Sequence, residues 1–236
     1  MSLATISIII PVLNEAAIIK DSLAKLDRSV DVEVIVVDGG SKDNTVCLAR
    51  ETGVKVISTT AAGRANQMNK GAEEATGDIL LFLHADTHLP SNYQKTVTEV
   101  LSQPKTIAGA FSLAIDSRQR SLRVVERAVN WRSRYFSLPY GDQAIFLKKS
   151  VFQEIGGFPN LPIMEDFELI QRLKCRGKIA IAPAAVLTSG RRWQKLGVFK
   201  TTLINQLIIF GYYLGIPPQK LKRLYTGITS NTKETG

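Results

Sequence analysis

Four short runs of β-branched and aliphatic residues, separated by helical patterns, constrain the fold of this chain more than any other feature of its sequence. The strand-like runs are residues 6–12, 32–37, 54–58 and 79–83, and the helical patterns are residues 16–26, 45–51 and 65–75. Because the runs lack the polar alternation of a strand with one wet face, we predict strands that are covered on both faces. The βαβαβαβ order predicts a parallel sheet with right-handed crossovers, in which ligands bind beyond the carboxyl ends of the strands.

After Pro90 the alternation becomes less regular, but the sequence contains no linker and no internal repeat. We predict further strands at residues 107–116, 143–147 and 179–188, and helices at residues 119–135 and 166–174. This second part is expected to continue the same sheet and to supply the remaining wall of the crevice. Residues 1–236 are therefore expected to form one domain, a length that a single core can support.

The composition is ordinary for a globular protein and excludes the disordered and collagen-like classes, since 44% of the residues are hydrophobic and 22% are charged. Cys47 and Cys175 are far apart, with no Cys or His at metal-ligand spacing, which argues against a zinc site and a secreted disulfide framework. The sequence has no uninterrupted apolar stretch of about 18 residues and no export signal. We therefore expect a cytoplasmic protein.

The charge is distributed unevenly along the chain. Residues 1–100 contain nine Lys/Arg and 13 Asp/Glu, whereas residues 101–236 contain 21 and eight. A basic half of this kind is compatible with nucleic acid, anionic lipid or phosphate-bearing small molecules, and charge alone does not choose among them. Nucleic acid is disfavoured, because no recognised binding motif and no interleaving of aromatic and basic residues accompanies the charge.

Polar side chains follow three of the predicted strands at their carboxyl ends, namely Asn14, Glu15, Asp38, His84 and Asp86. We expect them to converge on one crevice. Asp86 suits a hard divalent cation, which needs only one or two protein carboxylates when a diphosphate supplies further oxygen ligands. The alternatives are local: Asp86 could cap a turn, and His84 is equally compatible with a packed neutral histidine, a ribose contact or a metal ligand.

Four motifs carry a resemblance to a known family. They are Pro11-Val12-Leu13-Asn14-Glu15, Asp38-Gly39-Gly40-Ser41-x-Asp43-x-Thr45, His84-Ala85-Asp86, and Met164-Glu165-Asp166 followed by Arg172 and Gly177. In this order and spacing, over residues 6–195, they resemble the family 2 glycosyltransferases of the GT-A fold. Four shorter pieces resemble a subgroup of small soluble bacterial members: Gly63-Arg64-x-x-Gln67-Met68-Asn69, Leu83-His84-Ala85-Asp86-Thr87, Gly141-Asp142-Gln143 and Arg191-Arg192-Trp193.

The resemblance implies an α/β protein with an open, mostly parallel mixed sheet and helices on both faces. It implies transfer of a sugar from a nucleoside diphosphate donor, a UDP- or GDP-sugar, to a hydroxyl group, with inversion and with Mn²⁺ or Mg²⁺. Residues 1–90 would bind the donor, residues 91–195 would carry the acceptor and catalytic half, and residues 196–236 would form a C-terminal helical segment.

The resemblance also implies roles for individual residues. Asp166, beside Glu165, would be the general base, Asp86 would hold the metal, and Asp142 and Gln143 are acceptor contacts. The expected donor-binding residues are Pro11, Asn14, Glu15, Asp38, Arg64, His84, Arg191, Arg192 and Trp193. One position departs from the family pattern, because His84 stands where the first acid of Asp-x-Asp is expected.

The chemistry of these residue types agrees with that reading. A departing nucleoside diphosphate gains negative charge, which a divalent cation and arginines stabilise. An attacking hydroxyl loses a proton, and a positioned carboxylate accelerates such a step by about 10²- to 10⁴-fold. Three local alternatives remain: acids at residues 165–168 complement a helix dipole, residues 191–192 are ordinary surface charge, and residues 141–143 form a turn.

Two other functional classes stay open at this stage. A sugar-1-phosphate nucleotidyltransferase has a similar sheet, but a Gly- and Arg-rich loop is expected after its first strand, and residues 11–15 lack one. A non-catalytic nucleotide- or membrane-binding module would need only the basic half of the chain.

An apolar segment near the C-terminus, residues 203–216, has basic residues on both sides and is too short to span a bilayer. Three interpretations are open: a core helix, a dimer surface, or an interfacial helix on the cytoplasmic leaflet. The last would place the protein at the inner face of the membrane, with an acceptor that is lipid-linked.

Overall fold

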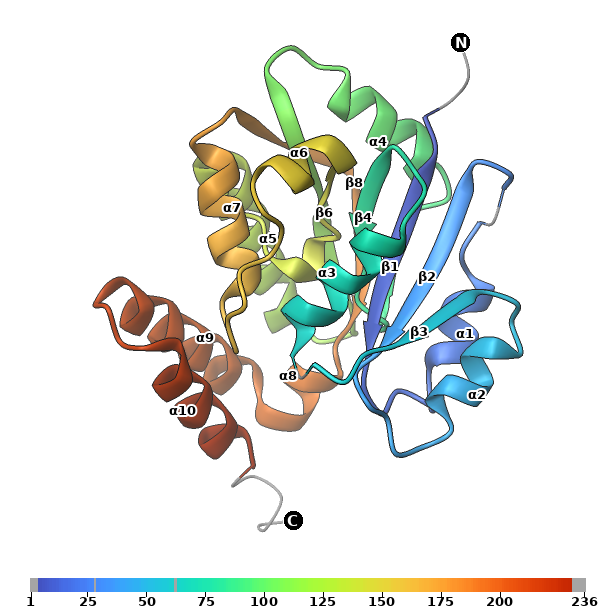
Figure 1. Cartoon of the computed structure of the whole chain (residues 1–236). Coiled ribbons are helices and arrows are strands. Elements are labelled where there is room, and N and C mark those ends of the chain that lie inside the picture. Colours follow the sequence, from blue (N-terminus) through green and yellow to red (C-terminus); the bar gives the residue numbers. More distant parts are fainter. Residues whose placement is uncertain (1–3, 28, 62, 231–236) are drawn as a thin grey trace.

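The computed structural model describes residues 4–27, 29–61 and 63–230. Within these ranges the chain forms an eight-stranded sheet flanked by helices (Figure 1), with the strand order β3-β2-β1-β4-β7-β6-β8-β5. The strands are β1 Ile6–Val12, β2 Val32–Asp38, β3 Lys55–Ser58, β4 Ile79–Phe82, β5 Thr87–His88, β6 Thr106–Asp116, β7 Phe146–Lys148 and β8 Lys178–Ser189. Strands from both parts of the chain therefore belong to one sheet.

The sheet is mixed and mostly parallel, as predicted. β1 pairs in parallel with β2 and with β4, β2 with β3, and β6 with β8. The short strand β7 is antiparallel to both β4 and β6 and joins the two parallel groups. β5 is antiparallel to β8 at the far edge.

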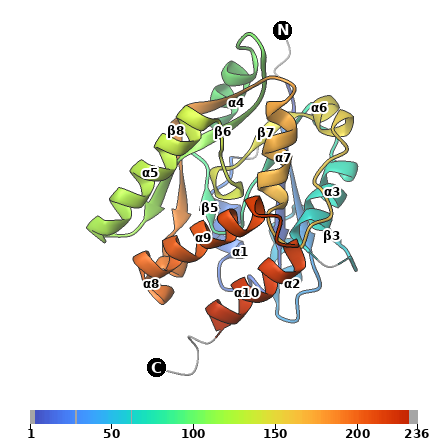
Figure 2. The same cartoon turned by 90° about the vertical axis from the view of Figure 1, so that its left-hand side faces the viewer.

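Helices cover both faces of this sheet. They are α1 Ile19–Ala24, α2 Thr45–Arg50, α3 Arg64–Glu74, α4 Tyr93–Leu101, α5 Arg120–Phe136, α6 Lys149–Glu154, α7 Glu165–Lys174, α8 Arg191–Leu196, α9 Val198–Tyr213 and α10 Pro218–Ser230, with a 3₁₀ turn η1 at Gly141–Gln143. One face packs on α1, α4 and α5, and the other packs on α3, α6 and α7. A third, smaller core joins α7 to α9 and α10 (Figure 2).

The buried strand residues explain why two helix layers form. β1 places Ile8 and Ile10 in the core on one side and Ile9 in the core on the other, and all three are at most 1% exposed. Successive side chains of a strand point to opposite faces, so a continuous apolar run requires cover on both sides.

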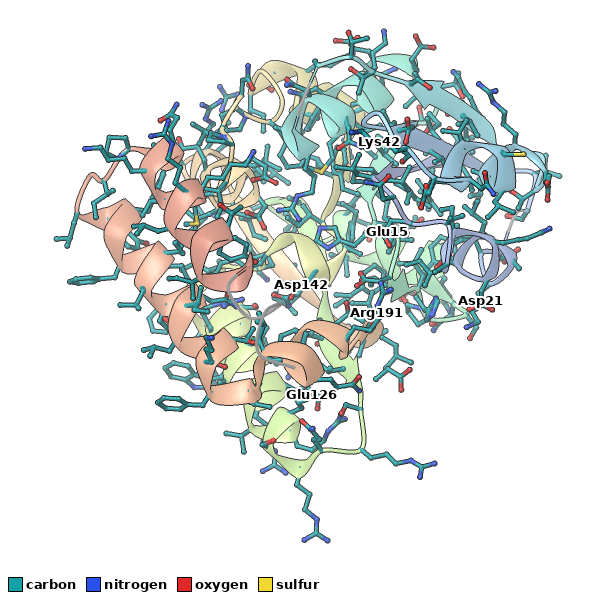
Figure 3. All side chains as sticks on the ribbon, turned by 90° about the horizontal axis from the view of Figure 1, so that it is seen from below. Glu15, Asp21, Lys42, Glu126, Asp142 and Arg191 are labelled. Atoms are coloured by element: carbon teal, nitrogen blue, oxygen red, sulfur yellow. The ribbon has the colours of Figure 1, made fainter. Side chains whose placement is uncertain are left out.

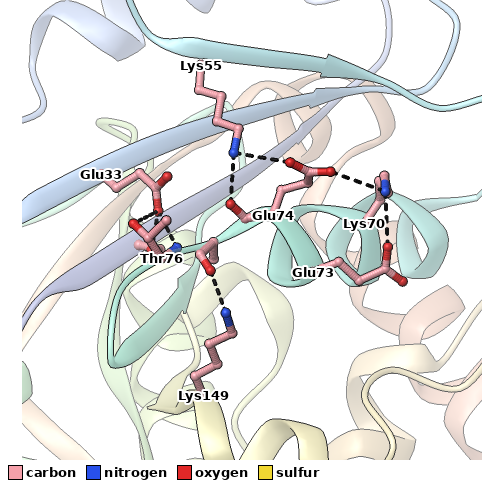
Figure 4. Close-up of polar contacts among 9 residues, drawn as sticks. Glu33, Lys55, Lys70, Glu73, Glu74, Thr76 and Lys149 are labelled. Atoms are coloured by element: carbon pink, nitrogen blue, oxygen red, sulfur yellow. Dashed lines mark hydrogen bonds and ion pairs between the residues drawn. The ribbon is translucent and has the colours of Figure 1, made fainter.

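Polar contacts at the opposite end of the sheet from the candidate site hold α3 in place (Figure 4). Glu33 of β2 accepts hydrogen bonds from the Thr76 N–H and hydroxyl, at 2.8 and 3.0 Å. Lys55 of β3 donates to the Glu74 carbonyl oxygen at 2.8 Å, and Lys149 donates to the Ala75 carbonyl oxygen. These contacts fix the C-terminal end of α3 and thereby position its N-terminus, where Arg64 lies.

Two predicted elements differ from the structure, and other elements were not predicted. The first helix begins at Ile19, because the Ile18 and Ile19 N–H groups both donate to the Glu15 carbonyl oxygen in a preceding turn. The strand predicted at residues 143–147 is divided into η1 and β7, because Ala144 has a left-handed backbone with φ 48°. The prediction also missed α4, α6, α8 and β5.

Candidate functional site

The loops that follow β1 and β2 are joined by hydrogen bonds. The Asn14 N–H donates to the Ser41 hydroxyl at 2.9 Å, and the Lys42 N–H donates to the Asn14 side-chain oxygen at 2.8 Å. The Glu15 N–H donates to the Thr45 hydroxyl at 2.8 Å. Asn14 has φ 55°, a left-handed conformation that asparagine tolerates better than most residues. The two loops therefore form one rigid edge beyond the strands.

Asp38, the last residue of β2, has a local role that the sequence did not reveal. Its carboxylate is almost fully buried and accepts the backbone N–H groups of Gly40 and Ser41 at 3.0 and 3.1 Å. Gln67 of α3 reinforces the same edge, since its side-chain nitrogen donates to the Val12 and Val37 carbonyl oxygens, both at 2.8 Å. Asp38 thus shapes the loop, and contact with a nucleoside stays a prediction.

Arg191, the first residue of α8, lies between two of the predicted carboxylates. One of its terminal nitrogens is 3.8 Å from Glu15 Oε2 and 3.6 Å from Asp86 Oδ2. Figure 3, in which the molecule is seen from below, labels Glu15 and Arg191. Partial burial raises the pKa of Glu15, Arg191 opposes this rise, and the nearby Asp86 adds to it. The sequence placed these three residues at one site, and the structure brings their charged ends together.

A cavity of about 560 Å³ opens beside this cluster and contains both Asp86 and Asp166. Among the described residues, Pro11, Asn14, Glu15 and Asp38 lie outside its lining, toward the β1 and β2 edge. The predicted residues that line the cavity are Arg64, His84, Asp86, Asp142, Glu165, Asp166 and Trp193. α9 and α10 contribute a wall that the sequence did not predict, formed by Asn205, Ile208, Ile209, Lys222, Tyr225 and Thr226.

The two acids at the start of α7 differ sharply in their surroundings. Glu165 is 3% exposed, and its Oε1 is 2.5 Å from Nε of Arg64. Asp166 accepts the backbone N–H groups of Gly141 and Phe167, both at 2.8 Å, and it has no ion pair among the described residues. Glu165 is therefore neutralised, and Asp166 presents an oriented carboxylate to the cavity.

His84 is a neutral histidine in this arrangement. Burial and the adjacent Arg64 lower its pKa to about 3. Arg64 Nη1 lies 3.2 Å from His84 Nε2, and because a guanidinium only donates, Nε2 is the acceptor and the ring proton is assigned to Nδ1. Arg64 thus connects His84, after β4, with Glu165, at the start of α7.

Two buried polar atoms of the cavity lining lack hydrogen-bond partners among the described residues, namely Asp142 Oδ1 and Trp193 Nε1. Burial raises the pKa of Asp142 to about 6; Arg132 opposes the rise, and Asp166 contributes to it. Unpaired buried polar groups are uncommon in proteins, and one explanation for them is a ligand that completes their hydrogen bonds. Figure 3 shows Asp142 among the elements that surround the cavity.

Gln143, the neighbour of Asp142, is turned into the protein. It is fully buried, its side-chain nitrogen donates to the Phe111 carbonyl oxygen at 2.9 Å, and its oxygen accepts the Ser133 hydroxyl at 2.7 Å. Its side chain supports the turn that carries Asp142, and we therefore remove Gln143 from the acceptor contacts. The side chain of Arg192 lies outside the described part of the structure.

The donor set at Asp86 fits a hard divalent cation that shares its coordination with a ligand. Carboxylates of Asp86 and Glu15 approach the same arginine nitrogen, so two oxygen donors are close together. Within the described ranges, no group of three or more His, Cys, Asp or Glu side chains is arranged to hold a metal. Mg²⁺ and similar ions are commonly held by one or two carboxylates together with substrate phosphates, which agrees with this sparse set.

The sheet is mostly parallel, and acidic groups lie beyond the carboxyl ends of its parallel strands, where open α/β sheets bind their ligands. Residues 7–158 match Glycosyl transferase family 2, and the chain belongs to this family. A PGL/p-HBAD biosynthesis glycosyltransferase of Mycobacterium tuberculosis is 27% identical over 227 residues, covering 87% of this chain and 83% of the relative. The chain is therefore a member of a family of sugar-transferring enzymes, as its motifs predicted.

Solved structures confirm the GT-A fold. A mannosyltransferase from Pyrobaculum calidifontis in complex with GDP-Man and Mn²⁺ superposes with a TM-score of 0.62 at 22% identity, covering 79% of this chain and 57% of that chain. Staphylococcus aureus TarS in complex with UDP-GlcNAc gives a TM-score of 0.63 at 18% identity, covering 78% and 58%. This chain thus spans less than two thirds of either protein.

Proposed function

We propose that this protein transfers a sugar from a UDP- or GDP-sugar to a hydroxyl-bearing acceptor, with inversion, and that Asp166 is the general base. The observation that carries the proposal is that Asp86 and Asp166 line the same cavity of about 560 Å³. One carboxylate then lies on the side of the departing diphosphate and the other on the side of the incoming hydroxyl.

The donor would lie along the edge formed by the loops after β1 and β2. Its nucleoside would contact Pro11, Asn14 and Asp38, and its diphosphate would approach Asp86 and Arg191. Arg191 is suited to this position because its guanidinium lies 3.6 Å from Asp86, where its positive charge would stabilise a developing diphosphate anion. A relative with GDP-Man and one with UDP-GlcNAc leave both bases as candidates.

Asp86, with Glu15 nearby, would hold Mn²⁺ or Mg²⁺. When bound, such an ion supplies Lewis-acid stabilisation of the leaving diphosphate. The support for this assignment is the close approach of two carboxylates to one point and the Mn²⁺ complex of the Pyrobaculum mannosyltransferase.

Asp166 is a better candidate for the base than Glu165. Arg64 forms an ion pair with the Glu165 carboxylate, so that carboxylate is already engaged by a protein side chain. Asp166 is held in orientation by two backbone N–H groups, and each of its oxygens keeps a further lone pair for the acceptor hydroxyl. Asp142 Oδ1 and Trp193 Nε1 would complete their hydrogen bonds with hydroxyl groups of the bound sugars.

The acceptor would lie between α7, α9 and α10. That part of the cavity is lined by Ile163, Phe167, Ile208, Ile209 and Tyr225, so an acceptor with an apolar portion beside its hydroxyl fits best. A lipid-linked hydroxyl is one compound of this kind.

The test is release of nucleoside diphosphate from a panel of UDP- and GDP-sugars, with and without Mn²⁺, in the presence of hydroxyl acceptors with apolar tails. Wild type is compared with Asp86→Ala, Asp166→Asn and the control Glu73→Gln, an exposed carboxylate on α3. We expect Asp166→Asn to lower turnover by about 10²- to 10⁴-fold while donor-induced thermal stabilisation persists. Equal turnover in all four proteins would refute the mechanism and the role of Asp166 as the base. Donor binding without turnover in wild type would favour a non-catalytic binding module.

A further inference from the structure

Helix α9 is apolar on two opposite sides. Its inner side, with Ile204 and Ile208, is buried in the third core. Its outer side carries six large apolar residues that are 47% to 82% exposed, which we call the α9 stripe: Phe199, Leu203, Leu207, Phe210, Tyr213 and Leu214.

The spacing of three or four residues places the α9 stripe along one face of the helix. Lys200 and Gln206 are the exposed polar residues beside it. A contiguous exposed apolar surface of this kind is unfavourable in water and marks an interaction site. Of the three interpretations of residues 203–216, the core helix thus describes only the inner side of α9.

The C-terminal part of the chain that carries the stripe is strongly basic. Residues 169–230 contain 11 Lys and Arg residues and no Asp or Glu. On α10, next to α9, Lys220, Lys222 and Arg223 are all exposed. This surface therefore presents apolar side chains with mostly positive surroundings, together with Glu168 of α7, which accepts a hydrogen bond from the Tyr212 hydroxyl of α9 at 2.8 Å.

Helix α5 extends the same side of the molecule (Figure 2). It contacts α9, and it exposes Trp131 and Tyr135, whose rings pack at 5.6 Å between centroids. Tryptophan and tyrosine are the aromatic residues that concentrate at membrane–water interfaces.

We propose that the α9 stripe docks on the surface of an anionic lipid bilayer, with α9 parallel to the membrane plane. The apolar side chains enter the boundary between headgroups and acyl chains, and the surrounding lysines and arginines attract anionic headgroups. No helix among the residues that the structure describes is long and apolar enough to cross a membrane. A second copy of the chain is a poorer occupant, because symmetric pairing would set one basic surface against another.

Docking would also orient the cavity. Ile208 and Ile209 line the cavity, while Leu207 and Phe210, on the same helix, belong to the stripe. The acceptor end of the cavity would therefore lie beside the membrane surface. The membrane contact itself does not depend on the catalytic assignment, because it is measured without substrate.

The experiment is cosedimentation of the full chain with vesicles of phosphatidylcholine alone, and with vesicles that also contain phosphatidylglycerol, at low and high salt. We expect binding to the anionic vesicles that weakens as salt screens the headgroups. Leu207→Ser combined with Phe210→Ser should weaken partitioning by at least about tenfold, from the apolar area lost. The matched control Val30→Ser, a fully exposed apolar residue before β2, should bind like wild type.

A charge variant separates the two contributions. Lys200→Glu with Lys220→Glu should reduce binding to anionic vesicles, whereas Lys95→Glu, an exposed lysine on α4, should not. Thermal melts of each variant verify that it is folded. The proposal is overturned if neither vesicle type binds the protein, or if the stripe variant binds as well as wild type. It is also overturned if sedimentation velocity shows a dimer that the stripe variant dissociates while vesicles remain unbound.

Discussion

Asp142 is expected to lower the stability of the folded protein, because its carboxylate is buried in the wall of the cavity. Its Oδ1 is buried without a partner among the described residues, and burial raises the pKa of the carboxyl from 3.8 to about 6. At neutral pH the carboxylate is therefore charged in an environment that favours the neutral acid. Replacing it by the isosteric amide, Asp142→Asn, removes this charge with little change in shape.

The magnitude follows from the pKa. A rise from 3.8 to about 6 corresponds to about 3 kcal/mol of destabilisation at pH 7, which is an upper bound because the side chain borders the cavity. Since the folded-state pKa of Asp142 lies above the unfolded value, the stability associated with its protonated carboxyl is fully present below about pH 4 and is lost as the pH rises through about 6. Asp142→Asn should therefore stabilise the protein most at pH 7, about half as much at pH 5, and little at lower pH.

Urea unfolding of wild type and Asp142→Asn at pH 5, 6 and 7 measures this difference as a shift in midpoint at constant slope. Turnover should fall in the same variant, as expected when a strained polar group serves a site. A variant that is equally stable at all three pH values, or less stable at pH 7, would show that the carboxylate finds a compensating partner and would refute this reasoning.

Three further predictions concern neighbouring positions. The folded-state pKa of His84, about 3, lies below the unfolded value of 6.5, so its contribution to stability is lost as the pH falls below 6.5. In urea unfolding, the free energy of unfolding should therefore fall less between pH 7 and pH 5 in His84→Gln than in wild type. In Gly141→Ala the added Cβ would lie 3.1 Å from an Asp166 carboxylate oxygen, so kcat should fall about tenfold or more with KM for the donor retained; an unchanged kcat would argue against Asp166 as the base. Gly71→Ala would set a Cβ 2.4 Å from a β1 isoleucine and should cost about 1–3 kcal/mol in unfolding free energy, whereas Gly227→Ala, with open space around it, should be neutral or slightly stabilising.

The order of strands and helices in the first 90 residues was predictable because burial on both sides leaves an unambiguous apolar pattern. β1 and β2 were placed within one residue of their observed ends. The segments after Pro90 were harder, since their structure depends on backbone conformations that apolar periodicity does not report. Ala144 illustrates this, because its left-handed backbone ends a turn inside what reads as one strand.

The sequence identified site residues whose chemistry follows from their own side chain. It did not reveal roles that depend on which groups a side chain hydrogen-bonds in the folded protein. The sequence identified Asp86 and Asp166, and the structure places both in one cavity. It gave no sign that Asp38 would be occupied by its own loop or that Gln143 would be turned inward. Both outcomes depend on which backbone N–H and hydroxyl groups lie within hydrogen-bond distance, and these come from segments distant in the chain.

The pairing of Arg64 with Glu165 explains how one short acidic motif can contain two different functions. Arg64 begins α3, which the contacts at the far end of the sheet hold in place, and Glu165 begins α7, so their ion pair joins two helices across the site. The adjacent Asp166 is therefore held in a fixed position, while the ion pair of Arg64 is formed with Glu165. Neutralising the first acid and orienting the second with backbone N–H groups yields one structural carboxylate and one available carboxylate. Two unpaired acids side by side would instead repel each other and raise the pKa of one of them.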